Sequence, residues 1–391
     1  LVVVRVLRYQ GAMVIVKTLV VLLLFAVCGA HAQQNITNSC CEVHSTPGCS
    51  NPSVQDCVCS VDPYCCQVAW ESSCVYNAEV FGCYQASQVW EGLSNMPLAA
   101  DGVAATAVGS DILVAGGYGD YDEGVTRAVR IYMSKYDSWY VTTMPFAVSG
   151  ASMVQGSNRS VVMGGSTSEL EASALTQVLA ADTWLIGAPA PHDFTLACAC
   201  TLGDIAYVFG GEDVTGRSWD DVLVYDIQAN TWKNGGELLK LKVPRSRAAC
   251  VADEEKDIIY VIGGYHSESN TILDSVEIYS FKGNVTHDFG TPIPEPTYML
   301  GAALLNGTEL WIAGGANGVT TLDTSYTFEE STNSWVSGPT LMEARYGFGF
   351  ATYNDGQSFF VAGGAYEDDA GGHYLNSTES FTLAGAEEVC S

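Results

Sequence analysis

Ile259-Tyr260-Val261-Ile262-Gly263-Gly264 shows the pattern that decides the fold, a short apolar run that ends in two glycines. Similar runs end at five other glycine pairs, which are Gly116-Gly117, Gly164-Gly165, Gly210-Gly211, Gly314-Gly315 and Gly363-Gly364. The six pairs recur at intervals of about 49 residues on average, which is typical of an array of equivalent supersecondary units. The chain is therefore one repeat architecture over most of its length.

The residues before each glycine pair are β-branched, aromatic or otherwise apolar, as in Phe359-Phe360-Val361-Ala362. An apolar run without polar interruptions favours a strand that is buried on both faces. Glycine then allows a positive φ where the strand ends and the chain turns. A phosphate-binding loop would need a helix directly after the glycines, and no helical pattern follows any of the six pairs.

A second signal lies downstream of the glycines, where an aromatic residue precedes a tryptophan by seven positions. The pairs are Tyr132 with Trp139, Tyr225 with Trp232, and Phe328 with Trp335. Turn-forming residues lie between them, so each pair predicts two antiparallel strands joined by a tight turn. The second repeat has Trp184 but Gln177 in the aromatic position, and the fourth has Tyr279 but Thr286 in the tryptophan position.

Together these features resemble the kelch repeat, which forms one four-stranded blade of a β-propeller. The resemblance covers about residues 88–383 and implies an all-β fold, a six-bladed kelch-type β-propeller preceded by a small disulfide-rich module. Trp90 matches the tryptophan of a last strand, but its three companion strands are absent upstream and expected at about 346–354, 358–362 and 377–383. We expect the Trp90 segment to complete the sixth blade within a propeller domain of residues 87–391.

Residues 1–32 show the pattern of a secretory signal peptide. Lys17 precedes an apolar stretch from Leu19 to Val27, and Ala30-His31-Ala32 is a small-residue cleavage pattern; Met13 is the expected start. A membrane anchor is the alternative, although the stretch is short for a span and no later segment is apolar enough. We therefore expect a secreted, extracellular protein with no membrane span after cleavage. Glycosylation is expected at the sequons of Asn35, Asn158, Asn284, Asn306 and Asn376.

The segment 33–86 is predicted to be a disulfide module, because so short a cysteine-rich segment of a secreted chain cannot build much apolar core. Asp62-Pro63 is expected to begin a helix through Trp70 to Phe81. Nine cysteines lie in the module and Cys390 is a plausible partner for the odd one; zinc binding is the alternative to disulfides. The expected disulfide cysteines are Cys40, Cys41, Cys49, Cys57, Cys59, Cys65, Cys66, Cys74, Cys83 and Cys390.

The chain is strongly acidic, with a formal net charge of −28. Residues 1–32 carry three basic residues and no acids, so their removal would leave −31. Nucleic acid is excluded as a partner, since binding to phosphates requires a basic surface. An acidic, solvated surface favours solubility.

The loops after the glycine pairs and the connectors between blades should open on one face of the propeller. Val243-Pro244-Arg245-Ser246-Arg247 and Glu343-Ala344-Arg345 resemble the segments from which kelch domains present arginines to acidic peptides. The resemblance implies a binding or scaffold protein that takes a protein or an anionic carbohydrate ligand. The alternative is that these arginines pair with acids on the same face. The candidate ligand-binding residues are Arg217, Arg245, Arg247, Arg345, His192, Tyr298, Tyr346, His266 and His373.

A carbohydrate-acting enzyme, of the sialic-acid mutarotase or kelch oxidase type, is the alternative function. Kelch oxidases resembling galactose oxidase have seven blades and a copper site of two Tyr and two His, and no such copper frame is recognisable here. We expect no catalytic residues, metal or cofactor. Cys198, Cys200 and Cys250 lie on expected inner strands of neighbouring blades. They are interpreted as three structural thiols, or one disulfide and a thiol, in preference to a metal site.

Overall fold

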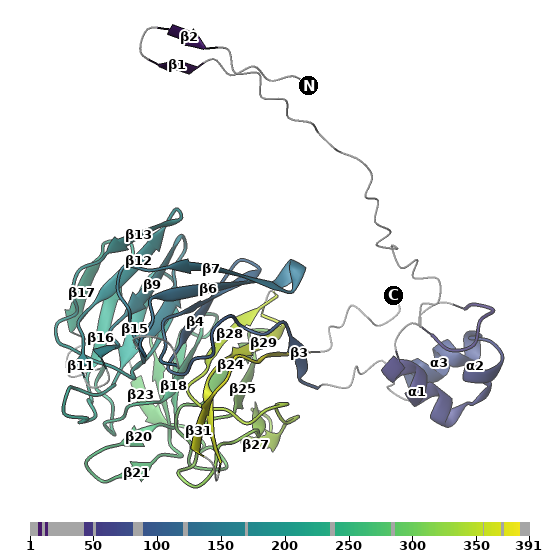
Figure 1. Ribbon diagram of the computed structural model, residues 1–391. Coiled ribbons are helices and arrows are strands. Elements are labelled where there is room, and N and C mark those ends of the chain that lie inside the picture. The colour runs from purple at the N-terminus through teal and green to yellow at the C-terminus, as the bar shows by residue number, and fades with distance from the viewer. Residues whose placement is uncertain are drawn as a thin grey trace. The chain divides into compact units, whose positions relative to one another are not determined.

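The computed structural model describes residues 7–9, 12–14, 43–49, 52–80, 89–119, 124–168, 171–234, 239–282, 286–354, 356–368 and 371–383. The chain divides into two compact units, one of Leu1–Ser87 with Ala386–Ser391 and one of Gln88–Gly385. The larger unit is nearly all-β and the smaller one contains three helices (Figure 1). The signal-peptide prediction, apart from two short strands at β1 (Leu7–Tyr9) and β2 (Ala12–Val14), falls outside the described residues.

The larger unit is a six-bladed β-propeller, as the repeat predicts, and every blade is a four-stranded antiparallel sheet. Blade 1 is β4 (Ala104–Val108), β5 (Asp111–Ala115), β6 (Ala128–Met133) and β7 (Ser138–Thr143). Blade 2 is β8 (Ser152–Gln155), β9 (Arg159–Met163), β12 (Thr176–Ala180) and β13 (Thr183–Ile186). Blade 3 is β14 (Cys198–Leu202), β15 (Ile205–Phe209), β16 (Val222–Asp226) and β17 (Thr231–Asn234).

The other three blades follow the same order along the chain, except at the closing strand. Blade 4 is β18 (Ala249–Asp253), β19 (Ile258–Ile262), β22 (Val276–Ser280) and β23 (Thr286–Phe289). Blade 5 is β24 (Gly301–Leu305), β25 (Glu309–Ala313), β26 (Ser325–Glu329) and β27 (Ser334–Ser337). Blade 6 is β28 (Gly349–Tyr353), β29 (Ser358–Ala362), β32 (Thr378–Thr382) and β3 (Glu91–Leu93).

Short hairpins extend the loops that follow three of the glycine pairs. They are β10 (Ser166–Ser168) with β11 (Glu171–Ala172), β20 (Tyr265–His266) with β21 (Thr271–Ile272), and β30 (Ala365–Asp368) with β31 (Gly371–Tyr374). A 3-10 turn, η1 (Ser134–Tyr136), joins the last two strands of blade 1. The loops after the glycines therefore differ most between blades, as a surface that varies around a fixed scaffold would.

The apolar core lies between blades. Six clusters of buried side chains each draw on two neighbouring blades, and the second strands supply residues such as Val161, Ile259 and Phe360 that are fully buried. This burial explains why the runs before the glycines are continuously apolar, because each second strand has a blade on both sides. Gly210 shows why glycine must follow: its φ is +61°, and an added Cβ would collide with the carbonyl of Arg245.

Blade 6 is built from two distant parts of the chain. Strand β3 follows directly on Trp90 and pairs antiparallel with β32, with Leu93 opposite Thr378. The Trp90 indole is buried between Phe359 and Phe381, with ring centroids 5.4 and 5.8 Å away. Its Nε1 donates a hydrogen bond to the carbonyl of Pro339 at 3.1 Å. The sheet of the last blade is thus completed by the segment that precedes the first blade.

The alignment of the second and fourth hairpins from sequence is wrong, because their turns differ in length from those of the other blades. In blade 2 the strands are joined by only two residues, Ala181 and Asp182, so Leu179 and not Gln177 lies opposite Trp184. In blade 4 the turn is longer, and His287 instead of Thr286 lies opposite Tyr279. The two rings stack at 4.1 Å between centroids, so a histidine replaces the tryptophan.

The smaller unit consists of α1 (Pro52–Val61), α2 (Tyr64–Gln67) and α3 (Ser72–Val80) around the buried Trp70. The single helix expected through Trp70 to Phe81 is wrong. The helix breaks at Val68, whose φ and ψ are −125° and −64°, and Trp70 forms a β-bridge with His44. The Asp62 carboxylate nevertheless accepts a hydrogen bond from the Tyr64 N–H at 3.2 Å, as expected for a helix start.

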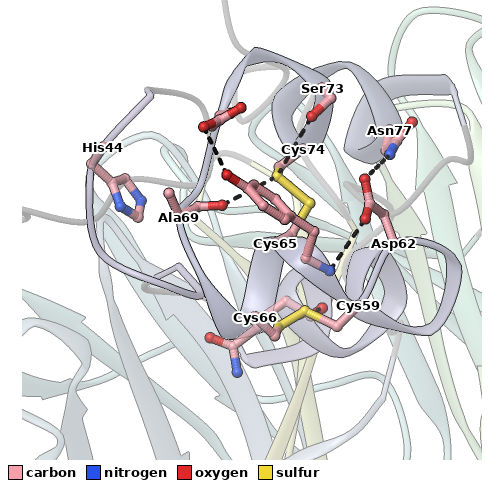
Figure 2. The surroundings of a disulfide bond; sticks show 12 residues. His44, Cys59, Asp62, Cys65, Cys66, Ala69, Ser73, Cys74 and Asn77 are labelled. Carbon is pink, nitrogen blue, oxygen red and sulfur yellow. Dashed lines mark hydrogen bonds between the residues drawn. A yellow bond between two sulfur atoms is a disulfide. The ribbon is translucent and has the colours of Figure 1, made fainter.

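Disulfides hold these short helices together (Figure 2). Cys59 is bonded to Cys66, and Cys65 is bonded to Cys74; Cys49 is disulfide-bonded as well. The predicted disulfides of Cys40, Cys41, Cys57, Cys83 and Cys390 concern side chains outside the described residues. The bonds compensate for a small apolar core, in which the described residues contribute four fully buried side chains, Val58, Cys65, Trp70 and Cys74.

Candidate functional site

A closed ring of backbone hydrogen bonds surrounds one end of the propeller channel. One residue of each inter-blade connector donates its N–H to the carbonyl of the equivalent residue in the preceding blade, at 2.7–3.2 Å. All six have φ between +54° and +63°, a region that glycine favours. We call them the ring residues: Gly102, Gly150, Leu196, Arg247, Met299 and Gly347.

The ring residues surround a cavity of about 140 Å³, here called the ring-side cavity. The first strands of all six blades begin at this ring and continue to a second cavity of about 310 Å³, the distal cavity. Three ring residues are glycines and leave their side of the rim open. Among the six, Arg247 alone carries a charge, so the ring presents one cation to anything that enters.

The Arg247 side chain is held by two neighbours from blades 3 and 4. Its Nη2 donates to Oε1 of Glu212 at 3.2 Å, and its guanidinium carbon lies 5.4 Å from the centre of the Tyr265 ring. The side chain is 26% exposed, and its Nε has no hydrogen-bond partner within the described structure. Arg247 is therefore positioned by an ion pair and an aromatic ring with one donor left unused.

The Glu212 carboxylate is buried, which makes its charged form costly. Burial raises its pKa above the usual range, against the opposing attraction of Arg247 and a hydrogen bond from the Ser246 hydroxyl at 3.0 Å. The free-energy cost of desolvating Glu212 offsets part of its attraction to Arg247, so the ion pair is weaker than its geometry alone suggests. An incoming anion would thus compete with Glu212 for Arg247.

Two tyrosines predicted for the site lie directly before ring residues. Tyr298 is half-buried at 6.5 Å from the Tyr265 ring, and the Tyr346 hydroxyl lies 3.3 Å from Oε1 of Glu367 and donates to it. Burial raises the pKa of both phenols, so they are neutral hydrogen-bond donors at physiological pH. Together with Arg247 they form the part of the predicted set that lies at the channel mouth.

Three of the other candidates lie in the loops after the glycine pairs, whereas His192 lies in the connector between blades 2 and 3, and each makes contacts of its own. Arg217 pairs with Glu268 at 3.1 Å, and the His266 Nδ1 lies 2.6 Å from the Ser269 hydroxyl. His373 pairs with Asp368 at 3.1 Å, whereas His192 packs on Trp219 with centroids 4.7 Å apart. The structure does not gather these four residues into one site.

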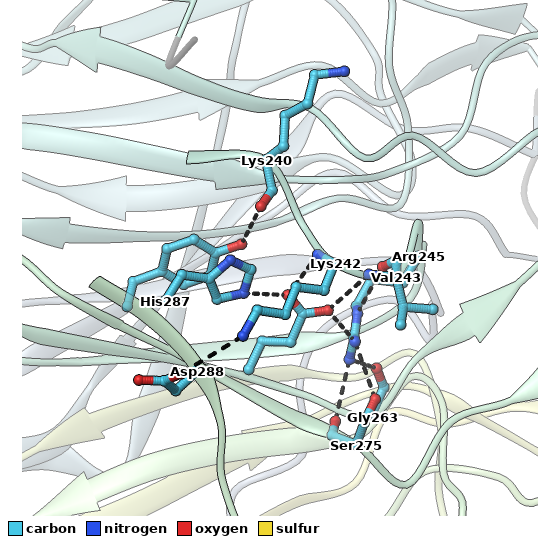
Figure 3. A network of polar contacts seen from close by, with 10 residues as sticks. Lys240, Lys242, Val243, Arg245, Gly263, Ser275, His287 and Asp288 are labelled. Carbon is cyan, nitrogen blue, oxygen red and sulfur yellow. Dashed lines mark hydrogen bonds and ion pairs between the residues drawn. The ribbon is translucent and has the colours of Figure 1, made fainter. Parts of the chain in front are cut away.

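For Arg245 and Arg345, the prediction of a ligand-binding role is wrong, because both side chains are fully buried. Figure 3 shows the Arg245 network: Nη1 donates to the carbonyl of Gly263 at 2.9 Å and Nη2 pairs with Glu277 at 2.5 Å. Arg345 repeats this arrangement in blade 6, with Gly363 at 2.9 Å and Glu379 at 2.5 Å. These two arginines hold the connector against the glycine turn.

The Glu277 carboxylate is satisfied on every side. Burial alone would raise its pKa, but a hydrogen bond from His287, the charge of Arg245 and the backbone N–H groups of Lys242 and Val243 bring the pKa below the usual range. Burial lowers the pKa of the Arg345 guanidinium, and Glu379 opposes that effect. Both arginines are therefore ion-paired within the protein, as the alternative interpretation has it, but with third-strand glutamates and not with acids of the mouth face.

Two buried polar residues at the equivalent position were missed from the sequence. Arg130, on the third strand of blade 1, donates to the carbonyls of Pro97 and Gly116 at 2.8 and 2.9 Å. Gln177, in blade 2, exchanges hydrogen bonds with the backbone of Phe146 at 2.8 and 3.2 Å. Each lies two residues before the residue opposite the hairpin Trp, the place that Glu277 and Glu379 take. A polar residue at this shared position in the repeat is the sequence signal that could have identified both.

The sequence profile of the KLHDC2/KLHL20/DRC7 Kelch-repeats domain matches residues 102–297 and, in a second register, 195–387. The two matches together span the propeller, and six blades with glycine turns and aromatic–Trp hairpins carry the same signature. The chain belongs to the kelch-repeat family. Among its kelch relatives, Kelch repeat and BTB domain-containing protein 1 of Camelpox virus (strain CMS) is 31% identical over 143 residues, which is 37% of this chain and 24% of that protein.

Two further kelch relatives come from animals. Kelch-like protein 36 of Mus musculus is 28% identical over 183 residues, covering 44% of this chain and 29% of the relative. Beta-scruin of Limulus polyphemus is 27% identical over 197 residues, covering 47% of this chain and 20% of the relative. The matched region is thus about a third or less of each relative, and the likeness concerns the kelch repeats.

Cys198, Cys200 and Cys250 are free thiols on the first strands of blades 3 and 4, where the sequence predicts them. Across the described ranges, no three His, Cys, Asp or Glu side chains are arranged to hold a metal ion. No helix in that part of the chain has both the length and the apolar character needed to cross a membrane.

Proposed function

We propose that the kelch propeller binds an acidic segment of a partner protein at the ring-side cavity, with Arg247 as the principal contact. The observation that carries the proposal is that Arg247, the one charged ring residue, lines a cavity of about 140 Å³ with its side chain 26% exposed and its buried Nε without a hydrogen-bond partner. Arginine suits this task because its planar group binds carboxylates through two parallel hydrogen bonds. A carboxylate that enters the cavity would replace Glu212 as the partner of Arg247, or would bind Arg247 in addition to Glu212.

The neighbouring side chains support a peptide ligand. Tyr298 offers a neutral hydroxyl donor, both Tyr298 and Tyr346 offer aromatic surface next to the ring, and the open side formed by Gly102, Gly150 and Gly347 leaves room for a main chain to pass. The loop hairpins of blades 2, 4 and 6 rise around this face and would supply the contacts that differ between partners. The surrounding acids limit non-specific binding of anions.

The test uses an array of acidic peptides and a matched array in which Gln and Asn replace Glu and Asp, with sulfated and sialylated glycans on the same surface. Arg247→Ala should weaken binding to the acidic peptides at least tenfold, about 1.4 kcal/mol. Arg217→Ala is the matched control, because it removes an exposed, ion-paired arginine outside the ring. Equal binding by Arg247→Ala, or equal binding of the amide array, would refute the proposal; selective glycan binding would assign the cavity to carbohydrate instead.

Glu212 gives the same proposal a test in the opposite direction. Glu212→Gln removes the charge that competes for Arg247 while keeping a side chain of the same shape. Binding of the acidic peptides should become stronger in this variant, since the arginine no longer has to leave an anionic partner. A loss of binding would show that Glu212 positions Arg247 and does not compete with the ligand.

We further propose that the protein is secreted. The signal-peptide pattern before Gln33 and the cysteine-rich module support this localisation. Asn158, Asn306 and Asn376 are exposed, so three of the five sequons are accessible to glycosylation, and Asn35 and Asn284 fall outside the described residues. Expression in eukaryotic cells, followed by N-terminal sequencing and glycosidase digestion of the medium, tests it. Retention of the full chain in the cells without a mass shift on digestion would count against secretion.

A further inference from the structure

Three free thiols meet at the contact between blades 3 and 4. Cys198 and Cys200 lie two residues apart on β14, so their side chains lie on the same face of the strand. Cys250 lies on the neighbouring strand β18, and all three belong to one cluster of side chains between the two blades. Within this cluster Cys250 lies close enough to both of the others to interact with each of them. This cluster is unlike the disulfide-bonded cysteines of the smaller unit.

The thiols lie along the channel at different depths. Cys198 lines the ring-side cavity and Cys200 lines the distal cavity, whereas Cys250 lines both. Cys198 and Cys250 are 7% and 6% exposed, and Cys200 is more exposed than either. Because the distal cavity has a volume of about 310 Å³, more than twice that of the ring-side cavity, a small molecule has better access to Cys200.

The environment gives the thiols different chemical roles. Burial, together with the hydrogen bonds of Cys198 and Cys200, raises the pKa of the Cys250 thiol well above its usual value. Cys250 therefore stays protonated and is a poor first nucleophile towards a molecule in solution. It nevertheless lies beside Cys200 in the same cluster and lines the same distal cavity, so it can attack a disulfide that has already formed there.

We propose that Cys200 and Cys250 form a reversible disulfide by exchange with a low-molecular-weight disulfide that enters the distal cavity. The Cys200 sulfur attacks one sulfur of the small disulfide, which breaks its S–S bond and releases one thiol. The Cys250 sulfur then attacks the Cys200 sulfur of the mixed disulfide and releases the second thiol. The two protein thiols are oxidised, the small disulfide is reduced to two thiols, and these take up the two protons.

The product would be a covalent link between the first strands of two blades, with Cys198 left as a thiol. Those strands line the channel directly below the ring, and β18 follows Arg247 along the chain by two residues. This site goes beyond the proposed peptide binding and does not depend on it, since the exchange begins at Cys200, which lines the distal cavity and not the ring-side cavity.

The experiment exposes the purified full chain to glutathione disulfide, blocks the remaining thiols with an alkylating agent, and maps the peptides by mass spectrometry. In the wild type we expect a peptide in which Cys200 is linked to Cys250, with Cys198 alkylated. Cys250→Ser should accumulate a glutathione adduct on Cys200, because the second attack is missing. Cys198→Ser, the matched control, should still form the link, and reduction should reverse it.

Three results would overturn the proposal. One is alkylation of all three thiols in the wild type after exposure; another is a wild-type link between Cys198 and Cys250; the third is a Cys250→Ser chain without an adduct on Cys200. Thermal unfolding of each variant shows whether it is folded. If Cys250→Ser does not fold, Cys200→Ser serves in its place and should give neither link nor adduct on the two remaining thiols.

Discussion

Ala100 and Arg345 occupy equivalent positions in the connectors to blades 1 and 6, just before Asp101 and Tyr346. In blade 6, Arg345 fills the space beneath the glycine turn and meets Glu379 on the third strand. In blade 1 the small Ala100 leaves that space to Arg130, which reaches the glycine carbonyl from the third strand itself. One guanidinium group thus satisfies the buried glycine carbonyl in each of these two blades, and the chain supplies it either from the connector or from the third strand.

This exchange explains why the sequence could not separate structural from exposed arginines. Arg245 and Arg247 are two residues apart in one connector, yet the first is fully buried and the second lies in the ring. Their difference depends on whether a carboxylate two residues before the aromatic position, here Glu277, is within reach across the blade. The sequence predicts which face of the propeller forms the channel mouth, but it does not predict which of these arginines lies there.

Arg345→Met should destabilise the propeller by about 3–5 kcal/mol, because the substitution leaves the carboxylate of Glu379 buried without its counter-charge. Arg247→Met should cost less than Arg345→Met, since the Arg247 side chain is 26% exposed and Glu212 keeps its hydrogen bond from Ser246. Chemical unfolding of both variants measures the difference. Equal losses of unfolding free energy in the two variants would mean that burial of the ion pair does not determine its contribution to stability.

Asp101 should make stability fall as the pH rises. Burial raises the pKa of this carboxyl to about 6, above the value of about 4 expected in the unfolded chain. The folded state therefore binds the proton more tightly between these two values, and stability is lost as the pH rises through about 6. Asp101→Asn should raise the melting temperature by a few degrees at pH 7.5 and leave it unchanged at pH 4. An equal gain at both pH values would contradict this assignment.

Among the elements, the outer hairpins are the ones whose strand register the sequence did not predict correctly in every blade. The Tyr132–Trp139 and Tyr225–Trp232 pairs lie opposite each other because four turn residues separate their strands. The fixed spacing fails when the turn is shorter, as at Ala181-Asp182, or longer, as before His287. A repeat of fixed period predicts the strands well, but the register of the outer hairpin depends on the length of its turn, which changes in blades 2 and 4.

The second strands, by contrast, end in a conformation that their glycines make possible. Gly210→Ala should destabilise the propeller more than Gly203→Ala, although both residues have a positive φ, of +61° and +59°. At Gly203 an added Cβ meets nothing within 4 Å, so only the backbone cost of about 1 kcal/mol applies. At Gly210 the Cβ would also collide with the Arg245 carbonyl. Similar unfolding free energies for the two variants would show that the connector at Arg245 shifts to accommodate the added Cβ.

For the whole molecule, six interblade cores and one hydrogen-bonded ring act together. The count of six blades and the role of the Trp90 segment could be derived from the spacing of tryptophans and glycines. The ring could not, because half of its members are Leu196, Arg247 and Met299, residues that rarely adopt a positive φ. Their conformation is imposed by closure of the whole circle and has no local signature.

Trp90→Ala should cost about 3–5 kcal/mol and release β3 from blade 6, because the indole is packed against Phe359 and Phe381. The exposed edge of β32 should then make the protein associate. Trp335→Ala is the matched control in blade 5, where all four strands are contiguous in sequence and pairing remains intact. Light scattering during mild heating should show aggregation earlier for Trp90→Ala; the same onset for both variants would argue against a special role of closure.

The pairing of β3 with β32 also sets an order of events during synthesis of the chain. Strand β3 leaves the ribosome before any blade exists, and its partner Thr378–Thr382 emerges only after the other five blades. Blades 1 to 5 can form as their strands appear, whereas Trp90 has no place to pack until translation of the propeller is nearly finished. Completion of blade 6 is therefore the last step of assembly, and until then the nascent chain carries an unpaired strand that a chaperone can recognise.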